Sequence, residues 1–126
     1  MKSFYISLAL FFVMIISIIF SINYLNKICK QLEQIDISME QDVNNESWDT
    51  AYTSSIDFMN KWKKYSENIS VFVDHKEIDN IHNELWRLTQ YIKCENKDET
   101  LASLHVIKFF LNHIMDMEKM NIQNIF

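Results

Sequence analysis

The chain of 126 residues contains no glycine and no proline. At an average usage of about 7% Gly and 5% Pro, a chain of this length would hold roughly nine and six of them. Hairpins rely on the positive φ angles of glycine, and proline marks the ends of strands and loops. Helices joined by short polar turns need neither residue. These two absences disfavour a β-sheet protein and predict an all-α fold.

Cysteine is scarce as well, and basic residues are in the minority. Cys29 and Cys94 are too few for a disulfide framework, and no Cys-x-x-Cys or Cys/His spacing of a zinc site is present. Twelve basic side chains stand against seventeen acidic ones, which gives a net charge of −5. Without a basic patch, a protein gains little from displacing the counterions of a nucleic acid. We therefore expect no nucleic-acid partner.

Charge is missing altogether between Phe4 and Leu25. A helix over this segment would be roughly 33 Å long at 1.5 Å per residue, enough to cross a hydrocarbon core of about 30 Å. Most of its residues are Leu, Ile, Val or Phe, each of which favours insertion by about 0.3 to 0.6 kcal/mol. We predict a transmembrane anchor over residues 1–26 and a helical-bundle domain over residues 27–126.

A cleaved signal peptide is the alternative to a retained anchor. It would share the basic start at Lys2, but its apolar region is about 7 to 15 residues long and ends at a small-residue cleavage site. The run here is longer, and the residues 21–23, Ser-Ile-Asn, do not form such a site. The orientation stays open from charge alone, because Lys2 and the amino terminus balance Lys27 and Lys30 under the positive-inside rule.

Beyond the anchor, apolar residues recur at helical spacing in four segments. The first continues the membrane helix to about Asn44, and the short connections between segments favour an antiparallel up-and-down bundle. The predicted inward faces are Ile28, Leu32, Ile35 and Met39 in the first segment; Trp48, Tyr52, Ser55, Met59, Trp62, Ser66, Ile69 and Val73, flanked by Ala51, Phe58, Tyr65 and Phe72, in the second; Ile78, Ile81, Leu85, Leu88 and Ile92 in the third; and Leu101, Leu104, Ile107, Leu111 and Ile114 in the fourth. Trp48, Trp62 and Trp86 could line a ligand pocket or a partner groove, but aromatic residues at helical spacing more often belong to the core, where we expect them.

Two aspartates mark expected helix starts. The side chain of Asp74 would accept the backbone N–H of Glu77, while Glu77 reaches back to Asp74 in a capping box. The residues 93–97 read as a tight turn, after which Asp98 would cap the fourth helix. In this helix order Cys29 lies at the membrane end and Cys94 at the far end, too far apart for a disulfide bond.

A metal or catalytic site finds little support. The four histidines are His75, His82, His105 and His113, yet the chain has no Glu-x-x-His, the motif on which di-iron sites of helical bundles depend. Nucleophilic catalysis needs a Ser or Cys beside an oriented His and donors for an oxyanion, and no such local arrangement occurs. We expect no enzyme activity, no metal and no cofactor.

The last residues are more apolar than a free chain end requires. They either pack back on the bundle or dock on a partner. The apolar residues in question are Met115, Met117, Met120, Ile122, Ile125 and Phe126.

Two segments together resemble a known family. They are FVDHKEID at residues 72–79, preceded by Trp48, Ala51 and Trp62, and HIMDMEKMNIQNIF at residues 113–126. The chain resembles, over essentially its full length, the family of short membrane-anchored proteins of spore-forming Firmicutes catalogued as domain of unknown function 4363. The most specific part is His75, Glu77 and Asp79 followed far downstream by Asn124, Ile125 and Phe126. Gln123 stands where the family pattern suggests a basic residue.

The resemblance implies a single-span protein whose C-terminal domain lies outside the cytoplasm, with no assigned activity and with a multi-spanning membrane protein as a partner. We therefore expect a non-enzymatic accessory or interaction subunit of a membrane or envelope complex. The alternative is an extracytoplasmic sensor or ligand-binding bundle that acts through a separate output partner. The candidate interaction residues are Met120, Ile122, Asn124, Ile125, Phe126, His75, Glu77 and Asp79.

Overall fold

The computed structural model describes residues 1–125, which form four α-helices and, within that range, no strand. The helices are α1 (Lys2–Asn44), α2 (Trp48–Ile69), α3 (His75–Lys93) and α4 (Lys97–Ile125). Three connections of three to five residues join them. The all-α prediction is confirmed, and the first helix ends at Asn44 as expected.

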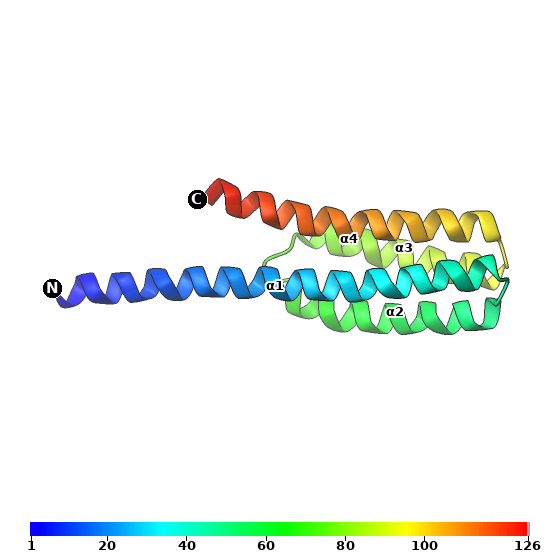
Figure 1. The fold of residues 1–126 in the computed structure, drawn as a ribbon, viewed down its shortest axis with the longest axis horizontal. Coiled ribbons are helices and arrows are strands. Elements are labelled where there is room, and N and C mark those ends of the chain that lie inside the picture. The colour runs from blue at the N-terminus through cyan, green and yellow to red at the C-terminus, as the bar shows by residue number, and fades with distance from the viewer. Residues whose placement is uncertain (126) are drawn as a thin grey trace.

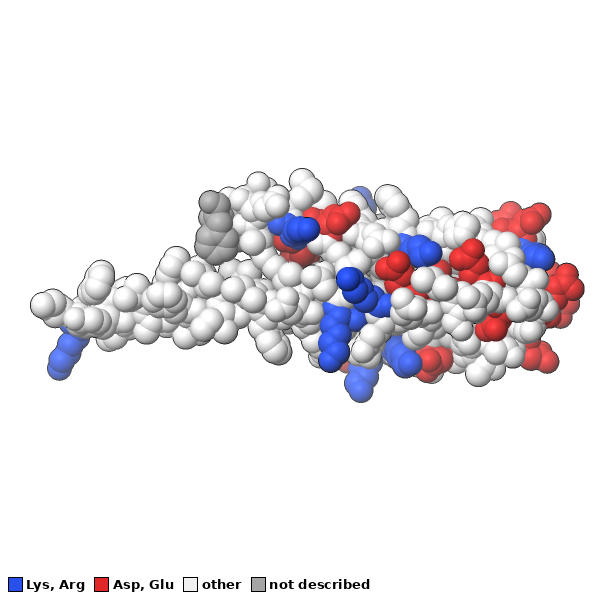
Figure 2. Space-filling model, viewed as in Figure 1, with Lys and Arg blue, Asp and Glu red and all other residues white. Residues whose placement is uncertain are grey.

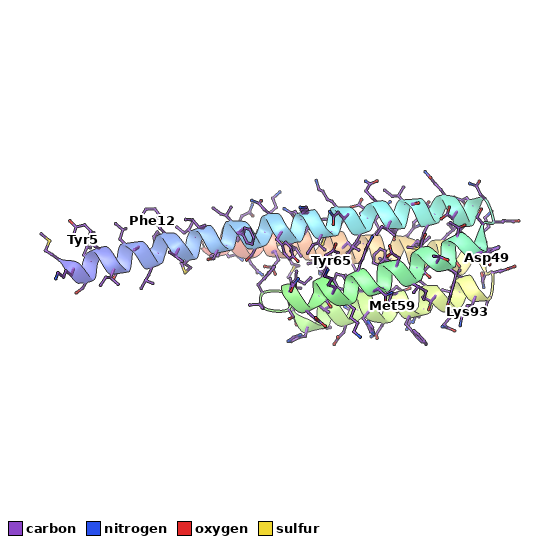
Figure 3. The ribbon with its side chains drawn as sticks, turned by 90° about the horizontal axis from the view of Figure 1, so that it is seen from below. Tyr5, Phe12, Asp49, Met59, Tyr65 and Lys93 are labelled. Atoms are coloured by element: carbon purple, nitrogen blue, oxygen red, sulfur yellow. The ribbon has the colours of Figure 1, made fainter. Side chains whose placement is uncertain are left out.

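α1 is one uninterrupted helix that belongs to two environments (Figure 1). Its first part extends beyond the other helices, and Figure 3 shows Tyr5 and Phe12 on this projecting segment with no neighbouring helix. From Leu25 onward one face of α1 is buried in the bundle. With no glycine or proline near the junction, every backbone N–H can continue the helical hydrogen-bond ladder, so the projecting segment and the bundle are joined rigidly.

The helices form an antiparallel up-and-down bundle with a square cross-section. Backbone contacts join α1 to α2, α2 to α3, α3 to α4 and α4 back to α1. α1 therefore lies diagonally across from α3, and α2 from α4. This arrangement follows from the short connections, because a chain that turns within three to five residues must pack each helix beside the one before it.

The core is built from the predicted faces. Phe58 and Trp62 of α2 are the largest fully buried side chains, and leucine and isoleucine fill the rest. Some residues of the predicted inward faces are only partly buried: Ile35, Leu101 and, in α2, Trp48, Tyr52, Met59 and Ser66. The buried face of α2 runs instead through Ala51, Ser55, Phe58, Trp62 and Ile69. The expectation that Trp86 belongs to the core is wrong, because its side chain is 61% exposed. Trp86 follows the buried Leu85 by one position. The rotation of about 100° per residue therefore turns the Trp86 side chain away from the core.

Two connections at the end of the bundle away from the projecting segment have the same conformation. In the first, Glu46 N–H bonds to Val43 O at 3.0 Å and Ser47 N–H to Asp42 O at 2.8 Å, the pair of bonds of a Schellman motif. Glu95 and the residue after it repeat this pattern at the end of α3. Both motifs need a left-handed residue, and glutamate takes that place, with φ of 58° at Glu46 and 53° at Glu95.

The helix starts differ from the predicted caps. Asp74 does cap α3, but its carboxylate accepts from the N–H of Lys76 at 3.1 Å rather than from Glu77. The capping box is therefore wrong, and the Glu77 side chain is turned toward α4 instead. Asp98 is not the cap of α4, because Asn96 accepts the N–H of Glu99 at 3.2 Å.

Candidate functional site

The two segments that carry the family resemblance meet at one end of the bundle. We call this end the base: it comprises residues 68–77 around the α2–α3 connection, residues 114–124 of α4, and the adjoining turns of α1. The opposite end, with the connections 45–47 and 94–96, is the far end. The antiparallel order of α3 and α4 brings the start of one beside the last turns of the other (Figure 1).

A hollow of about 230 Å³ separates the first turn of α3 from α4. One pair of side chains bridges the two helices nearby, because Nε2 of His113 lies 3.5 Å from Oε1 of Glu77. Glu77 therefore joins the two segments, which sequence separation alone could not indicate. The hollow is lined by Phe72, Val73, Asp74, Glu77, Ile114, Met117, Glu118 and Asn121.

A second hollow, of about 240 Å³, lies between the last turns of α4 and the apolar part of α1. The last turns of α4 border α1 at this hollow. Met115 and Ile122 are partly buried, whereas Met117 and Met120 are exposed, so the choice between packing back and docking on a partner stays a prediction. Partial burial raises the pKa of Glu118 in this region above its ordinary value. The lining residues are Met14, Ser17, Ile18, Ser21, Ile22, Phe72, Glu118, Asn121 and Ile122.

The eight candidate interaction residues have different surroundings. Glu77 and Ile122 line the two hollows. The other described side chains, His75, Asp79, Met120 and Asn124, are exposed. Ile125 ends α4, and Phe126 lies outside the described residues.

α4 also exposes apolar side chains outside its core stripe, a feature that sequence reasoning missed. We call Val106, Phe109 and Met117 the outer stripe. Phe109 is 63% exposed, and its ring stacks on His113 with centroids 5.9 Å apart. The helix therefore has two apolar faces. The sequence did contain a signal for these exposed residues. Val106 and Phe109 are apolar but fall between the predicted inward positions of this helix.

A buried carboxyl in α1 is the second feature that was missed. Asp36 is fully buried, and neither of its oxygens has a hydrogen-bond partner among the described residues. Burial raises its pKa to about 7, while the positive charge of Lys108 on α4 acts in the opposite direction. The signal was present in the sequence, because Asp36 follows Leu32 by four positions and precedes Met39 by three, in phase with the buried face.

Potential metal ligands do not gather. His105 and His113 each approach one glutamate, Glu40 and Glu77, on another helix. Within residues 1–125 no group of three His, Cys, Asp or Glu side chains converges. The base thus combines hollows, exposed apolar side chains and isolated charged groups.

The two thiols differ sharply. Cys29 is buried near the base, and burial raises its pKa to about 12, with Glu33 adding to the effect. Cys94 is exposed in the far-end connection. The predicted separation of the two residues is confirmed by this helix order.

Comparison with known proteins places the chain in a family. A search of curated proteins and a search of solved structures found no match. The model of the family described as "Domain of unknown function (DUF4363)" matches residues 19–125, a stretch that includes all of the bundle and the base. The chain therefore belongs to the DUF4363 family.

Proposed function

We propose that this protein is a membrane-anchored accessory subunit without catalytic activity, whose bundle binds another membrane or envelope protein. In this proposal the N-terminal half of α1 is a retained signal anchor with a single span. The bundle stands outside the cytoplasm. The observation on which the proposal chiefly rests is the apolar outer stripe of α4, held at a fixed height above the membrane by an unbroken α1.

The anchor is supported by the exposure of the projecting part of α1. α1 is long and apolar enough to cross a membrane, and none of its apolar window is buried within the chain. Phenylalanine and isoleucine side chains on this segment would face water in a soluble protein, at a cost that burial in lipid removes. Figure 2 shows a long uncharged surface between Lys2 and the first lysines of the bundle.

The partner is supported by where exposed apolar area lies. Beyond the projecting segment, the described large apolar side chains that are exposed are Val71, Trp86, Val106, Phe109, Met117 and Met120. Four of these six belong to α4. Val106 and Phe109 are three positions apart, as are Met117 and Met120, and exposed apolar side chains on one helix match the groove of another helical protein.

Site-specific photocrosslinking in native membranes tests this proposal. A photoreactive phenylalanine analogue at Phe109 should crosslink to one discrete membrane or envelope protein, and the same analogue at Thr50, exposed on α2, should not. Phe109→Asp should abolish co-purification of that protein without lowering the thermal stability of the bundle. Failure of Phe109→Asp to weaken co-purification would refute the role of the outer stripe.

The orientation has a convenient natural probe. Cys94 is exposed at the far end, whereas Cys29 is buried and its raised pKa keeps the thiol protonated and unreactive. A membrane-impermeant maleimide added to intact cells should therefore label the unmodified protein, and Cys94→Ser should lose the label. Labelling that requires permeabilised cells would place the bundle in the cytoplasm and contradict the proposed orientation.

A ligand-binding sensor remains the second candidate, and one hollow favours it. At the far end, a hollow of about 360 Å³ includes Trp48, Tyr52 and Lys93, with the Lys93 ammonium 5.6 Å from the centre of the Tyr52 ring. Asp49 and Glu95 also line this hollow, so its aromatic rings suit a small cationic or aromatic ligand. In this case Tyr52→Ala would abolish the biological response and leave the Phe109 crosslink intact.

A further inference from the structure

The last turns of α4 lie beside the apolar segment of α1. The hollow between them is bordered by Met14 and Ile22 of α1 and by Ile122 of α4. Met14 and Ile22 are separated by about 12 Å along a helix axis. If residues 4–25 cross the bilayer, the end of α4 must therefore extend below the level at which the hydrocarbon begins.

The side chains at the base suit such a position. Val71, in the α2–α3 connection, is 88% exposed, and Met120 near the end of α4 is 57% exposed. The connection from Ser70 to Asp74 exposes Val71 and carries one charge, at Asp74, and each far-end connection likewise carries one charge, a glutamate. A valine that is 88% exposed in a loop facing water keeps its apolar surface hydrated. Insertion of the same side chain into lipid removes that surface from water, which is favourable.

Tyrosine and lysine, which membrane interfaces favour, lie near the base, alongside the charged Asp74, Glu118 and Lys119. The hydroxyl of Tyr24 accepts a hydrogen bond from the Asn68 side chain at 3.0 Å, which ties α1 to α2 one turn above Val71. Tyrosine is enriched at the headgroup level, and lysine side chains reach from there into water. Lys27 and Lys30 follow Tyr24 along α1 with exposed side chains. Tyr24 and the lysines thus mark the headgroup level, and Val71 and Met120 lie on the lipid side of it.

We propose that the base of the bundle is a second lipid-contacting surface, in which Val71 and the last turns of α4 enter the bilayer interface beside the anchor. This inference rests on the anchorage proposed above. The occupant is the phospholipid of the membrane that α1 crosses. α1, the α2–α3 connection and the last turns of α4 then all contact the membrane and hold the bundle upright. The outer stripe of α4 faces sideways, toward proteins in the same membrane.

Depth measurements on the full-length chain in phosphatidylcholine vesicles test the inference. Single cysteines are introduced at Val71, Met120, Phe11 and Thr50 in a Cys94→Ser background, where the buried Cys29 stays unlabelled, and are coupled to an environment-sensitive fluorophore. Labels at Val71→Cys and Met120→Cys should be quenched several-fold more by lipids with a nitroxide near the headgroup than by a water-soluble quencher. The label at Thr50→Cys, at the far end, should show the reverse.

The Phe11→Cys label distinguishes failure of the proposed anchor from failure of the proposed lipid-contacting base. If it is quenched by lipid while the Val71 and Met120 labels are quenched from water, the anchor stands and the lipid-contacting base is refuted. If the Phe11 label is also in water, the anchorage fails and the inference fails with it. Protection of the Met120 label that grows with the protein-to-lipid ratio would mean that a second copy covers the base, which would also overturn the assignment to lipid.

Discussion

The base and the far end of the bundle are built from the same four helices but from different residues. The far half, residues 34–59 and 82–111, contains ten acidic and four basic side chains, whereas the base half, residues 26–33, 60–81 and 112–125, contains seven of each. Figure 2 shows the acidic side chains gathered at the far end. The far-end connections are polar, but the base connection exposes Val71. One end is thus suited to water, and the other to a less polar neighbour.

This difference has a consequence for stability. The two halves differ in the charge of their side chains and in the backbone geometry of their connections. The far half has repulsion between like charges, a buried carboxyl at Asp36 and two left-handed glutamates. The base half has apolar contacts that continue into α1. We therefore expect stabilising substitutions in the far half and destabilising ones in the base.

The largest expected effect concerns Asp36. Its pKa is about 7 in the bundle, against 3.8 for an ordinary aspartate, so between these values the folded protein holds a proton that the unfolded chain has lost. Stability should therefore fall as the pH rises from about 4 to about 7, by on the order of 4 kcal/mol. Asp36→Asn should remove this slope in denaturant unfolding of the full chain in detergent micelles.

Asp57→Asn is the matched control for Asp36. Asp57 lies on the surface, where it pairs with Lys61 at 3.1 Å, and exposed pairs of this kind contribute about 0 to 1 kcal/mol. Its loss should leave the pH dependence of unfolding nearly unchanged. An Asp36→Asn variant with the same pH dependence as the unmodified protein would show that the carboxylate is solvated, and the contrast between the two halves would weaken.

The next effect concerns the junction of anchor and bundle. Leu25 is fully buried although it ends the apolar segment. Leu25→Ala should lower the free energy of unfolding by about 2 to 5 kcal/mol, because it leaves a cavity in the base. Phe20→Ala, at a side chain that is 70% exposed, should change it by less than about 0.5 kcal/mol. Equal losses in micelles would mean that the base is not packed as part of the core.

The smallest effect concerns the two left-handed glutamates. Because a side chain with a Cβ is strained at positive φ, Glu46→Gly and Glu95→Gly should each raise the free energy of unfolding by about 0.5 to 1 kcal/mol. Glu46→Ala and Glu95→Ala remove the same charge but keep the Cβ, so they separate the geometric gain from charge relief. If the alanine variants gain as much as the glycine variants, repulsion at the far end is the cause.

Sequence reasoning identified the helices better than their ends. The stripe from Ile78 to Ile92 is buried as predicted, because spacing of three and four residues places side chains on one face whatever the helix packs against. The caps were harder. Asp74 and Asn96 both cap helices, but which N–H each side chain reaches depends on how the preceding residues enter the helix, and sequence pattern does not specify that path.

The candidate site shows the same division. The sequence singled out the segments 72–79 and 113–126, but it gave no indication that Glu77 and His113 approach each other. The sequence also gave no indication that His75 and Asp79 are exposed, whereas Glu77, which lies between them in the chain, is partly buried. Rotation about the helix axis, at about 100° per residue, turns neighbours in sequence toward different surroundings.

Composition and periodicity were sufficient to establish an all-α chain, an apolar N-terminal helix long enough to cross a membrane, and the inward faces of four amphipathic segments. These are local properties, set by propensity and spacing within one helix. The burial of Asp36 and the approach of α4 to the apolar part of α1 depend on contacts between residues far apart in the chain. Such contacts exist only once the helices have packed, since a side chain is buried by its neighbours and not by its own helix.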